Sequence, residues 1–262
     1  MSDVLYPILE AKRARLKKSK ENFPLEQLKE ICRTLPAPPP FVSSIVRPGQ
    51  LTVIAEMKKS SPSAGLILPI YEPEKIAAAY ARCGAAGISV LTEEDYFHGS
   101  QTDLKEVRAA VSLPIIRKDF IFDPYQVYET RSMGASAMLL ISAILSAEDL
   151  FVLHALALSL GLDVLVEVHT PAELDLALTV RPRLIGINNR NLKTLAIDLA
   201  TTFALRPRVP SDIHVVSESG IKTEQDVCRL KSVNVQSVLV GESILKSPEM
   251  TKTLTGLVRA GE

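Results

Sequence analysis

The segment LPIIRKDFIFDPYQVYETRSMGASAMLLI (113–141) contains one complete strand–helix–strand unit. A short apolar run opens it and another closes it. Between them, Pro124 and Gly134 stand where the first turn and the end of a helix are expected. Because both apolar runs are almost uninterrupted, we expect strands that are buried on both faces, as in a parallel sheet. The segment therefore predicts one repeat of a parallel α/β fold.

The same alternation of apolar runs and helical spacing continues in both directions along the chain. The eight apolar runs are LTVIAEM (51–57), ISVLT (88–92), LPIIRKD (113–119), AMLLIS (137–142), DVLVEVH (163–169), LIGINNR (184–190), HVVSES (214–219) and SVLVGE (237–242). Helical spacing marks residues 73–84, 124–134, 147–161, 171–180 and 223–232. Eight such units predict an α/β fold of the (β/α)8 TIM barrel type. The alternative is a doubly wound open sheet, but neither GxGxxG nor GxxxxGK[ST] occurs, which favours the barrel.

Residues 1–50 do not follow this repeat. They predict helices over about residues 3–20 and 24–34, followed by a rigid proline-rich linker at 36–40. We interpret them as a helical N-terminal extension packed on one barrel end, and we expect the basic cluster KRARLKK (12–18) to form a solvated helix face. Residues 1–262 are thus expected to form a single barrel domain, with the extension at 1–50 and the barrel at 51–262.

Composition excludes several classes of protein. The 262 residues carry 30 Lys+Arg and 30 Asp+Glu, and this zero net charge argues against a nucleic-acid binder. No run approaches the roughly 20 apolar residues of a membrane span, and the charged N-terminus does not resemble a signal peptide. The three cysteines form no disulfide framework and the four histidines no metal motif. We therefore expect a cytoplasmic protein without a metal, bound to neither nucleic acid nor a membrane.

Polar residues interrupt the apolar runs near their C-terminal ends. Glu56 and Lys58 share one face of the first strand, and Lys118, Glu167 and Asn188 end three others. In a barrel the C-terminal strand ends surround the active site. Because buried charges are costly unless they are paired, these lysines and glutamates are expected to hold one another ionised for acid–base chemistry.

The last two strands end in features typical of an anion site. Gly220 and Gly241 follow these strands, and a helix start is expected after each. Glycine lets backbone N–H groups approach an anion, and barrels commonly bind phosphate at this position. The loop KKSSPSAG (58–65) adds hydroxyl groups near the same mouth. The sequence therefore predicts a phosphorylated small-molecule substrate.

Several of these motifs coincide with those of a known enzyme family. The chain resembles indole-3-glycerol phosphate synthases in IAEMKKSSPSAG (54–65), ISVLTEEDYFHGS (88–100), residues 113–141, LVEVHT (165–170), IGINNRNLKT (185–194), VVSESGI (215–221) and VLVGESILKS (238–247). The resemblance covers essentially the whole chain. It implies decarboxylating ring closure of 1-(2-carboxyphenylamino)-1-deoxy-D-ribulose 5-phosphate to indole-3-glycerol phosphate, CO2 and water, in tryptophan biosynthesis.

The resemblance also implies a role for each catalytic residue. Lys118 matches the general acid of ring closure, and Glu167 matches the carboxylate that assists dehydration. Lys58 matches a lysine near the anthranilate carboxylate, while Glu56 and Asn188 match residues that position these groups. The residues expected to bind substrate are Ser61, Gly220 and Gly241 at the phosphate, Ser219 beside the substrate, Phe97 and Phe120 as apolar walls, and Arg190 and Glu218 as supporting partners.

No organic cofactor or metal is implied, and we expect a monomer. The chain departs from many relatives at Ala64, Leu68 and Glu242, where a basic residue, Arg and Ser are common, respectively. With Glu242 in this place, we expect the phosphate contact after Gly241 to come from the backbone alone. These departures bear on affinity rather than on activity.

Two other functions are compatible with a phosphate-binding barrel. One is a different barrel enzyme, either a phosphoribosylanthranilate isomerase, which needs Cys and Asp at strand ends, or a Schiff-base aldolase, for which Lys118 would be the candidate. The other is a non-catalytic phosphate-binding or scaffold protein, which would lack acid–base pairs such as those of Glu56 and Glu167 with the lysines.

Overall fold

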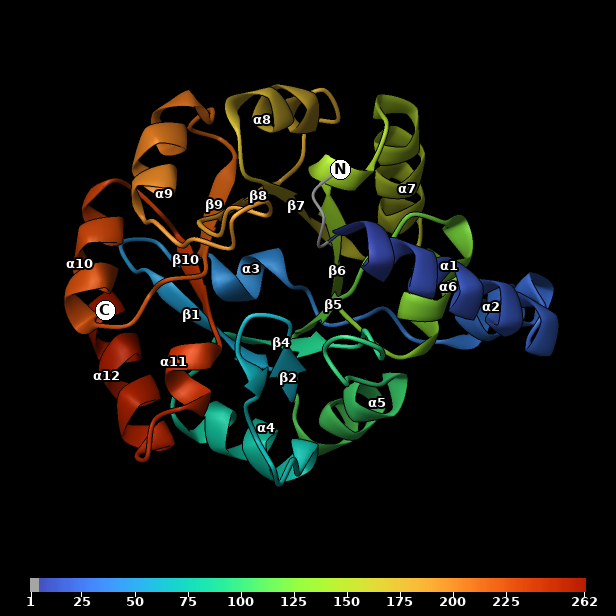
Figure 1. Ribbon diagram of the computed structural model, residues 1–262, viewed down its shortest axis with the longest axis horizontal. Helices are drawn as coiled ribbons and strands as arrows, with labels where there is room; N and C mark the ends of the chain where they lie inside the picture. The colour runs from blue at the N-terminus through green and yellow to red at the C-terminus, as the bar shows by residue number, and fades with distance from the viewer. Residues whose placement is uncertain (1–4) are drawn as a thin grey trace.

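Eight parallel strands close into a barrel in the computed structural model, which describes residues 5–262 (Figure 1). Each strand pairs with the next one along the chain, and the last pairs with the first. The predicted (β/α)8 barrel is therefore confirmed. Its strands are β1 (Thr52–Met57), β4 (Gly87–Leu91), β5 (Ile115–Lys118), β6 (Ala137–Ile141), β7 (Asp163–Val168), β8 (Leu184–Asn188), β9 (His214–Glu218) and β10 (Ser237–Val240).

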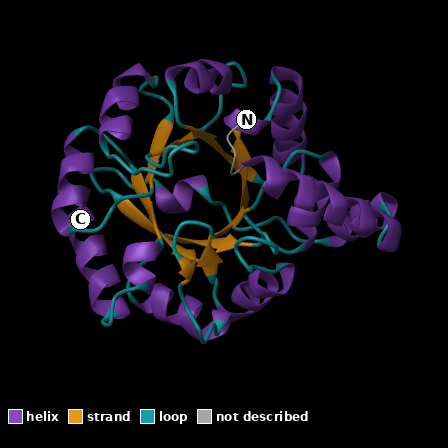
Figure 2. Ribbon diagram, viewed as in Figure 1, coloured by secondary structure: helices purple, strands orange, loops and turns teal. Residues whose placement is uncertain are grey.

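Helices surround this ring of strands (Figure 2). They are α4 (Pro73–Arg82), α5 (Gln101–Ala110), α6 (Pro124–Ser132), α7 (Ala147–Ser159), α8 (Pro171–Leu178), α9 (Ala200–Leu205), α10 (Glu224–Ser232), α11 (Glu242–Leu245) and α12 (Met250–Gly261), with the short helices η1 (Ser142–Ile144) and η2 (Arg206–Arg208). Side chains of Asp123 and Thr170 cap α6 and α8, whose first residue is proline. The five helical segments predicted from spacing all form.

Each strand divides its side chains between two apolar layers. On β1, Val53, Ala55 and Met57 pack outward against the helices, whereas Ile54 packs inside the barrel. Glu56 is the next inward position after Ile54 and lies in the cavity at the C-terminal mouth. The interior is thus apolar near the N-terminal end and polar near the mouth, because the same alternation carries a charged residue to the last inward position.

The N-terminal segment reaches both ends of the barrel. Helices α1 (Leu5–Asn22) and α2 (Leu25–Thr34) lie on one side, and α3 (Val42–Ile45) is seen inside the ring of strands in Figure 1. Phe41 and Ile45 pack into the interior at the N-terminal end, where the hydroxyls of Thr52 and Ser237 donate to the Ile45 carbonyl. By contrast, Lys12 of α1 contacts Asp119 directly after β5. The expectation that the extension packs on one barrel end was therefore wrong.

The prolines at 36–40 explain this path. A proline-rich segment is stiff and extended, so it can carry the chain from the outer helix α2 to the opposite end of the barrel. There, backbone N–H groups of Phe41 and Val42 donate to Asp163 at the start of β7.

Residues 3 and 4 of the predicted first helix lie outside the described residues. Within residues 5–262, none of the helices combines the length and apolar character needed to cross a membrane.

Candidate active site

A cavity of about 510 Å3 opens at the C-terminal ends of the strands. Its volume is within the usual range for small-molecule sites. Side chains or backbone from all eight strand ends line it. The predicted site residues that line it are Glu56, Lys58, Phe97, Lys118, Phe120, Glu167, Asn188, Arg190, Glu218, Ser219, Gly220 and Gly241. The topology thus brings together residues from the first to the last strand of the barrel.

Lys118 lies between two carboxylates that follow it by 49 and 100 residues in the sequence. Its Nζ is 2.9 Å from Oε2 of Glu167 on β7 and 3.0 Å from Oε2 of Glu218 on β9. All three side chains are largely buried, and the side chain of Lys118 is 16% exposed. An ammonium group has three N–H donors, of which these carboxylates occupy two, and none of residues 5–262 accepts the third, which a ligand in the cavity can use.

The three groups differ in their protonation. Burial alone would lower the pKa of Lys118, but Glu167, Glu218 and Glu56 outweigh it and raise that pKa above its usual value. Burial also acts to raise the pKa of Glu167, but Lys118 and His169 outweigh it, and this pKa lies well below its usual range. Burial, helped by the charge of Glu167, raises the pKa of Glu218 to about 7 despite Lys118. The site therefore holds one firmly ionised carboxylate and one that takes up a proton near neutral pH.

The position of the Glu218 side chain depends on a glycine on the neighbouring strand. A Cβ on Gly186 of β8 would overlap Oε1 of Glu218. This Oε1 is buried and has no hydrogen-bond partner within the part of the chain that the structure describes. Because only Oε2 is paired with Lys118, the carboxyl group of Glu218 can carry a proton on its other oxygen.

A second glutamate, two strands along the barrel from Glu218, is accommodated in the same way. Nζ of Lys58 is 2.7 Å from Oε2 of Glu56. A Cβ on Gly241, directly after β10, would lie 2.6 Å from that same oxygen. The sequence indicated that Gly241 leaves its backbone open to an anion, and the structure adds that it leaves room for Glu56.

The predicted anion site lies at the end of the cavity that follows β9 and β10. Ser219 and Gly220 both have left-handed backbone conformations, with φ of 63° and 86°. A Cβ on Gly220 would lie 2.6 Å from the side chain of Ile197, so the turn is closely packed. The guanidinium of Arg190 is 3.7 Å from the carboxylate of Glu242. Successive N–H groups and a guanidinium are the donors that a phosphate requires.

The side chain of Glu242 is charged and pairs with cations at this end of the cavity. Its Oε1 is 2.7 Å from Nζ of Lys246, which also lines the cavity. The sequence predicted a backbone contact alone at this position. The structure shows that Glu242 holds Lys246 and faces Arg190, so the cations nearest the anion site are partly neutralised before a ligand binds.

The opposite end of the cavity is apolar. The rings of Phe97 and Phe120 have centroids 6.2 Å apart and are tilted by 41°. Leu139 and Ile141 of β6 complete this wall. The loop that carries Phe97 is held by the buried carboxylate of Glu93, which accepts the N–H groups of residues 95, 96 and 97. This end suits an aromatic ring.

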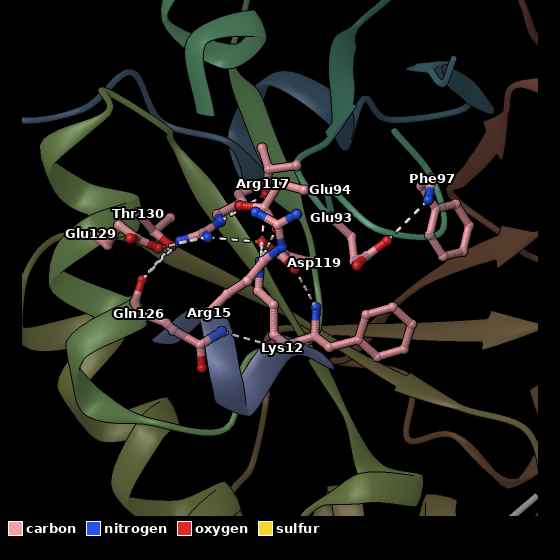
Figure 3. A network of polar contacts seen from close by, with 12 residues as sticks. Lys12, Arg15, Glu93, Glu94, Phe97, Arg117, Asp119, Gln126, Glu129 and Thr130 are labelled. Carbon is pink, nitrogen blue, oxygen red and sulfur yellow. Dashed lines mark hydrogen bonds and ion pairs between the residues drawn. The ribbon is translucent and has the colours of Figure 1, made fainter. Parts of the chain in front are cut away.

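A buried ionic network supports the strand end that carries Lys118 (Figure 3). Arg117 points away from the cavity and is fully buried, 2.8 Å from Asp119 and 2.7 Å from Glu129 of α6. Nζ of Lys12 lies 2.8 Å from the same oxygen of Asp119. Burial raises the pKa of Asp119, but Lys12 and Arg117 outweigh it and lower that pKa to about 2. The prediction that residues 12–18 form a solvated face was wrong for Lys12.

Ser61 is not among the residues that line the cavity. It lies in the hairpin of β2 (Ser60–Ser61) and β3 (Gly65–Leu66), where its hydroxyl accepts the N–H of Ala64.

Sequence reasoning did not single out the apolar residues Leu139 and Leu239 or the pair of His169 and Glu173. Strand alternation could have identified the leucines, whereas the position of His169 depends on contacts between separate elements.

The described residues contain no group of three or more His, Cys, Asp and Glu side chains arranged to hold a metal ion. His154 is buried on α7, as expected for a histidine packed in the core. The cysteines lie in or beside helices, at Cys32 of α2, Cys83 after α4 and Cys228 of α10. The polar groups that line the cavity include lysine, arginine, carboxylate and amide side chains.

A family model and two relatives that match this chain carry the same description. The family model described as indole-3-glycerol phosphate synthase matches residues 5–257. A protein of that name from Dehalococcoides mccartyi is 48% identical over 246 residues, covering 93% of this chain and 95% of the relative. One from Azospirillum brasilense is 43% identical over 261 residues, covering 98% and 100%. These matches agree with the resemblance seen in the motifs.

Two solved structures similar to this one have much lower sequence identity. The 3-hexulose-6-phosphate synthase of Salmonella typhimurium has a TM-score of 0.65 at 11% identity, covering 80% of this chain and 98% of that one. A mutant tryptophan synthase α-subunit from Pyrococcus furiosus has a TM-score of 0.61 at 14% identity, covering 82% and 99%. At these identities the likeness concerns the fold alone.

Proposed function

Because the chain belongs to the indole-3-glycerol phosphate synthase family, we propose that the cavity at its C-terminal barrel mouth carries out the ring closure of that family. The enzyme is a decarboxylating carbon–carbon lyase of tryptophan biosynthesis and acts on a phosphorylated small molecule. Its reaction converts 1-(2-carboxyphenylamino)-1-deoxy-D-ribulose 5-phosphate to indole-3-glycerol phosphate, CO2 and water. The observation that carries the proposal is the position of Lys118 between Glu167 and Glu218, in a cavity that is also lined by apolar residues and by the predicted anion site.

We propose one orientation for the substrate in the cavity. We place the phosphate at the N–H groups of Ser219, Gly220 and Gly241 with Arg190, and the carboxyphenyl ring against Phe97 and Phe120. In this orientation the sugar chain crosses the mouth in front of Lys118. The ketone carbon can then meet the ring carbon that bears the carboxylate, which is the bond that ring closure must form.

The first step needs an acid at the ketone oxygen. The third N–H of Lys118 is free for this oxygen, and the neighbouring carboxylates keep the lysine protonated. Lys58, paired with Glu56, is placed to hold the substrate carboxylate until it leaves as CO2, which restores the aromatic ring. Asn188 holds the turn after β8, because its Oδ1 accepts the N–H of Arg190.

The second step needs the new hydroxyl to leave as water. Lys118, once it has been reprotonated, can give a proton to the hydroxyl oxygen, and a base must take a proton from the ring system. We assign the base to Glu167, which stays ionised at neutral pH. Glu218, whose pKa of about 7 matches the working pH, is suited to return a proton to Lys118 after the first step.

The alternatives from the sequence lack support in this geometry. A Schiff-base lysine needs a lowered pKa, whereas the pKa of Lys118 is raised. The isomerase needs a cysteine at a strand end, and Cys32, Cys83 and Cys228 lie in or beside helices. A scaffold protein has no use for buried acid–base pairs at the mouth of its cavity.

We also propose that the chain works as a monomer in the cytoplasm. In support of this, the cavity is built by one copy of the chain, and Cys32, Cys83 and Cys228 are free thiols. Light scattering after size-exclusion chromatography measures the mass directly. A single species close to 28.6 kDa is expected, and a stable dimer would contradict the proposal.

The activity is tested by incubating the purified protein with the carboxyphenylamino substrate and recording indole fluorescence. We expect product to form without any added cofactor or metal. Folded protein that produces no indole fluorescence at millimolar substrate would refute the proposed function. Full activity after dialysis against a chelator would show that the enzyme requires no metal.

A further inference from the structure

His169 is a buried histidine that lies directly after β7, between two glutamates. Its Nδ1 is 2.9 Å from Oε2 of Glu173 on α8, and its Nε2 is 3.3 Å from Oε1 of Glu167. We propose that His169 is a positioning residue that, anchored by Glu173, decides which of the two carboxylates beside Lys118 remains ionised. This inference rests on the proposed role of Glu167 as the base, and it assigns to His169 a part in the same reaction.

Glu173 fixes the orientation of the imidazole. Its Oε2 accepts the backbone N–H of His169 at 2.8 Å and also faces Nδ1, and its Oε1 accepts the hydroxyl of Thr170 at 3.1 Å. Glu173 lies in the first turn of α8, where the helix dipole favours a negative charge. An ionised Glu173 therefore keeps a proton on Nδ1 and turns Nε2 toward Glu167.

The two glutamates beside Lys118 differ in what faces their second oxygen. Oε2 of each glutamate accepts an N–H of Lys118. Oε1 of Glu167 faces the imidazole of His169, whereas Oε1 of Glu218 has no hydrogen-bond partner among the residues described. A carboxylate with a cation at each oxygen stays ionised, and one with a single cation accepts a proton more readily. Burial acts to raise both pKa values and Lys118 to lower both, and only Glu167 has His169 as a further cation, which helps to hold its pKa below the usual range while that of Glu218 is raised to about 7.

The contact between His169 and Glu167 acts through charge more than through a directed hydrogen bond. At 3.3 Å, Nε2 is within ion-pair distance of Glu167, but its N–H is poorly aligned with the oxygen. The orientation of the ring is therefore set on the Glu173 side, where the distance is shorter. His169 therefore acts on Glu167 through the charge of its ring.

The surroundings of His169 contain few other charged groups. From the β6 side, η1 contributes Ser142, Ala143 and Ile144, which do not titrate in this range. From β8, the register places uncharged Asn188 beside the end of β7. Lys118 and Glu218 lie beyond Glu167. Burial lowers the pKa of His169, but Glu167 and Glu173 outweigh it and raise that pKa to about 9. The ring is therefore charged at neutral pH.

The first test measures protonation without substrate, so it does not depend on the proposed activity. In wild-type protein, NMR of the 15N-labelled ring is expected to show His169 charged through pH 8. In Glu173→Gln, which preserves the shape of the side chain, the midpoint of this titration should fall by at least one pH unit. In His169→Gln, with 13C-labelled glutamate side chains, the midpoint of Glu167 should rise. An unchanged Glu167 titration in a folded His169→Gln variant would overturn the proposal.

The second test measures catalysis. His169→Gln is expected to lower kcat at least tenfold with little change in KM, and Glu173→Gln to move the alkaline limb of the kcat profile to lower pH. His214→Gln, at the start of β9, is the matched control and should keep the wild-type profile. If His169→Gln does not fold, Glu173→Gln alone decides the question. Wild-type pH profiles in both variants would mean that His169 only supports the strand end. An inactive wild-type protein with the expected titrations would instead refute the proposed function.

Discussion

Gly186 on β8 leaves the space that the carboxylate of Glu218 on β9 occupies beside Lys118. A methyl group at Gly186 would overlap Oε1 of Glu218. Because that oxygen is the end of a flexible side chain, the carboxylate can turn aside while the strand stays in place. The same relationship connects Gly241, directly after β10, with Glu56 on the neighbouring strand β1. In both cases a glycine on or directly after one strand leaves room for a charged residue of the neighbouring strand.

The first prediction concerns this relationship. Gly186→Ala is expected to fold but to lose at least tenfold in kcat, because Glu218 can no longer reach Lys118. Steady-state kinetics and a thermal melt measure the two effects. Gly256→Ala on α12 is the matched control, since its methyl also meets a glutamate carboxylate, that of exposed Glu224. Wild-type kcat in Gly186→Ala would contradict the argument.

The second prediction concerns the groups that carry the chemistry. Lys118→Met and Glu167→Gln are each expected to lower kcat by a factor of about 10² to 10⁴, the usual contribution of a general acid or base. Circular dichroism and thermal melts check that both variants fold. Near-normal turnover in both would remove the roles proposed for these residues.

The third prediction concerns stability and pH. Since the pKa of Glu218 is raised from 4.5 to about 7, folded protein binds more protons than unfolded protein between these values, and stability must fall as the pH rises through this window. One pKa unit corresponds to about 1.4 kcal/mol, so the cost approaches about 3 kcal/mol above pH 7. Glu218→Gln should therefore be more stable than wild type at pH 8, although less active.

Urea denaturation at pH 5 and pH 8 measures this difference. The free energy of unfolding of Glu218→Gln should decline less between the two pH values than that of wild type. Glu148→Gln, at an exposed site in the first turn of α7, is the control and should follow wild type. Parallel declines in all three proteins would show that Glu218 is ionised at no cost to the fold.

The fourth prediction concerns the buried network shown in Figure 3. Lys12→Met removes one cation from Asp119 but leaves Arg117 and Thr92 in place, so we expect a loss of about 1–3 kcal/mol at pH 7. Because the pKa of Asp119 is lowered to about 2, its contribution is present above its unfolded value and is lost as the pH falls through 2. The variant should therefore unfold at a higher pH during acid titration.

Lys17→Met provides the comparison, because Lys17 lies on the exposed side of the same helix. It should match wild type in both the urea and the acid titrations. If Lys12→Met also matches wild type, the contact between Lys12 and Asp119 contributes nothing measurable.

The fifth prediction concerns the apolar wall. Phe97→Leu is expected to raise KM about three- to tenfold with a smaller change in kcat, because aromatic contacts are worth about 0.5–1.5 kcal/mol. Phe151→Leu, on the exposed face of α7, should leave both constants unchanged. A change in kcat alone would indicate that Phe97 acts on the loop held by Glu93 rather than on the substrate.

The sequence was sufficient to predict the barrel and much of its mouth. Apolar runs with two-residue alternation determine which side chains face inward, and parallel strands in a closed barrel bring their C-terminal ends together. Lys118, Glu167 and Glu218 could therefore be expected to meet although up to 100 residues separate them. Helix α9, with six residues after a long loop, has too little periodicity to be recognised in this way.

Other features depend on contacts that no local pattern encodes. Lys12 reaches Asp119 across 107 residues because the proline-rich linker lets the extension pass along the whole barrel. The basic cluster alone gives no sign that one of its lysines is buried. The same is true of Gly186, whose importance comes from a side chain on the neighbouring strand.

The sequence by itself thus determined the fold, the end of the barrel that carries the site and the kinds of groups found there. Only the tertiary structure decided their charge states. Glu167 and Glu218 are the same residue type beside the same lysine, yet one faces His169 with its second oxygen and the other faces no partner among the described residues. The physical reason is that the pKa of a buried group depends on burial and on distances of a few ångströms between separate strands and helices, which exist only after folding.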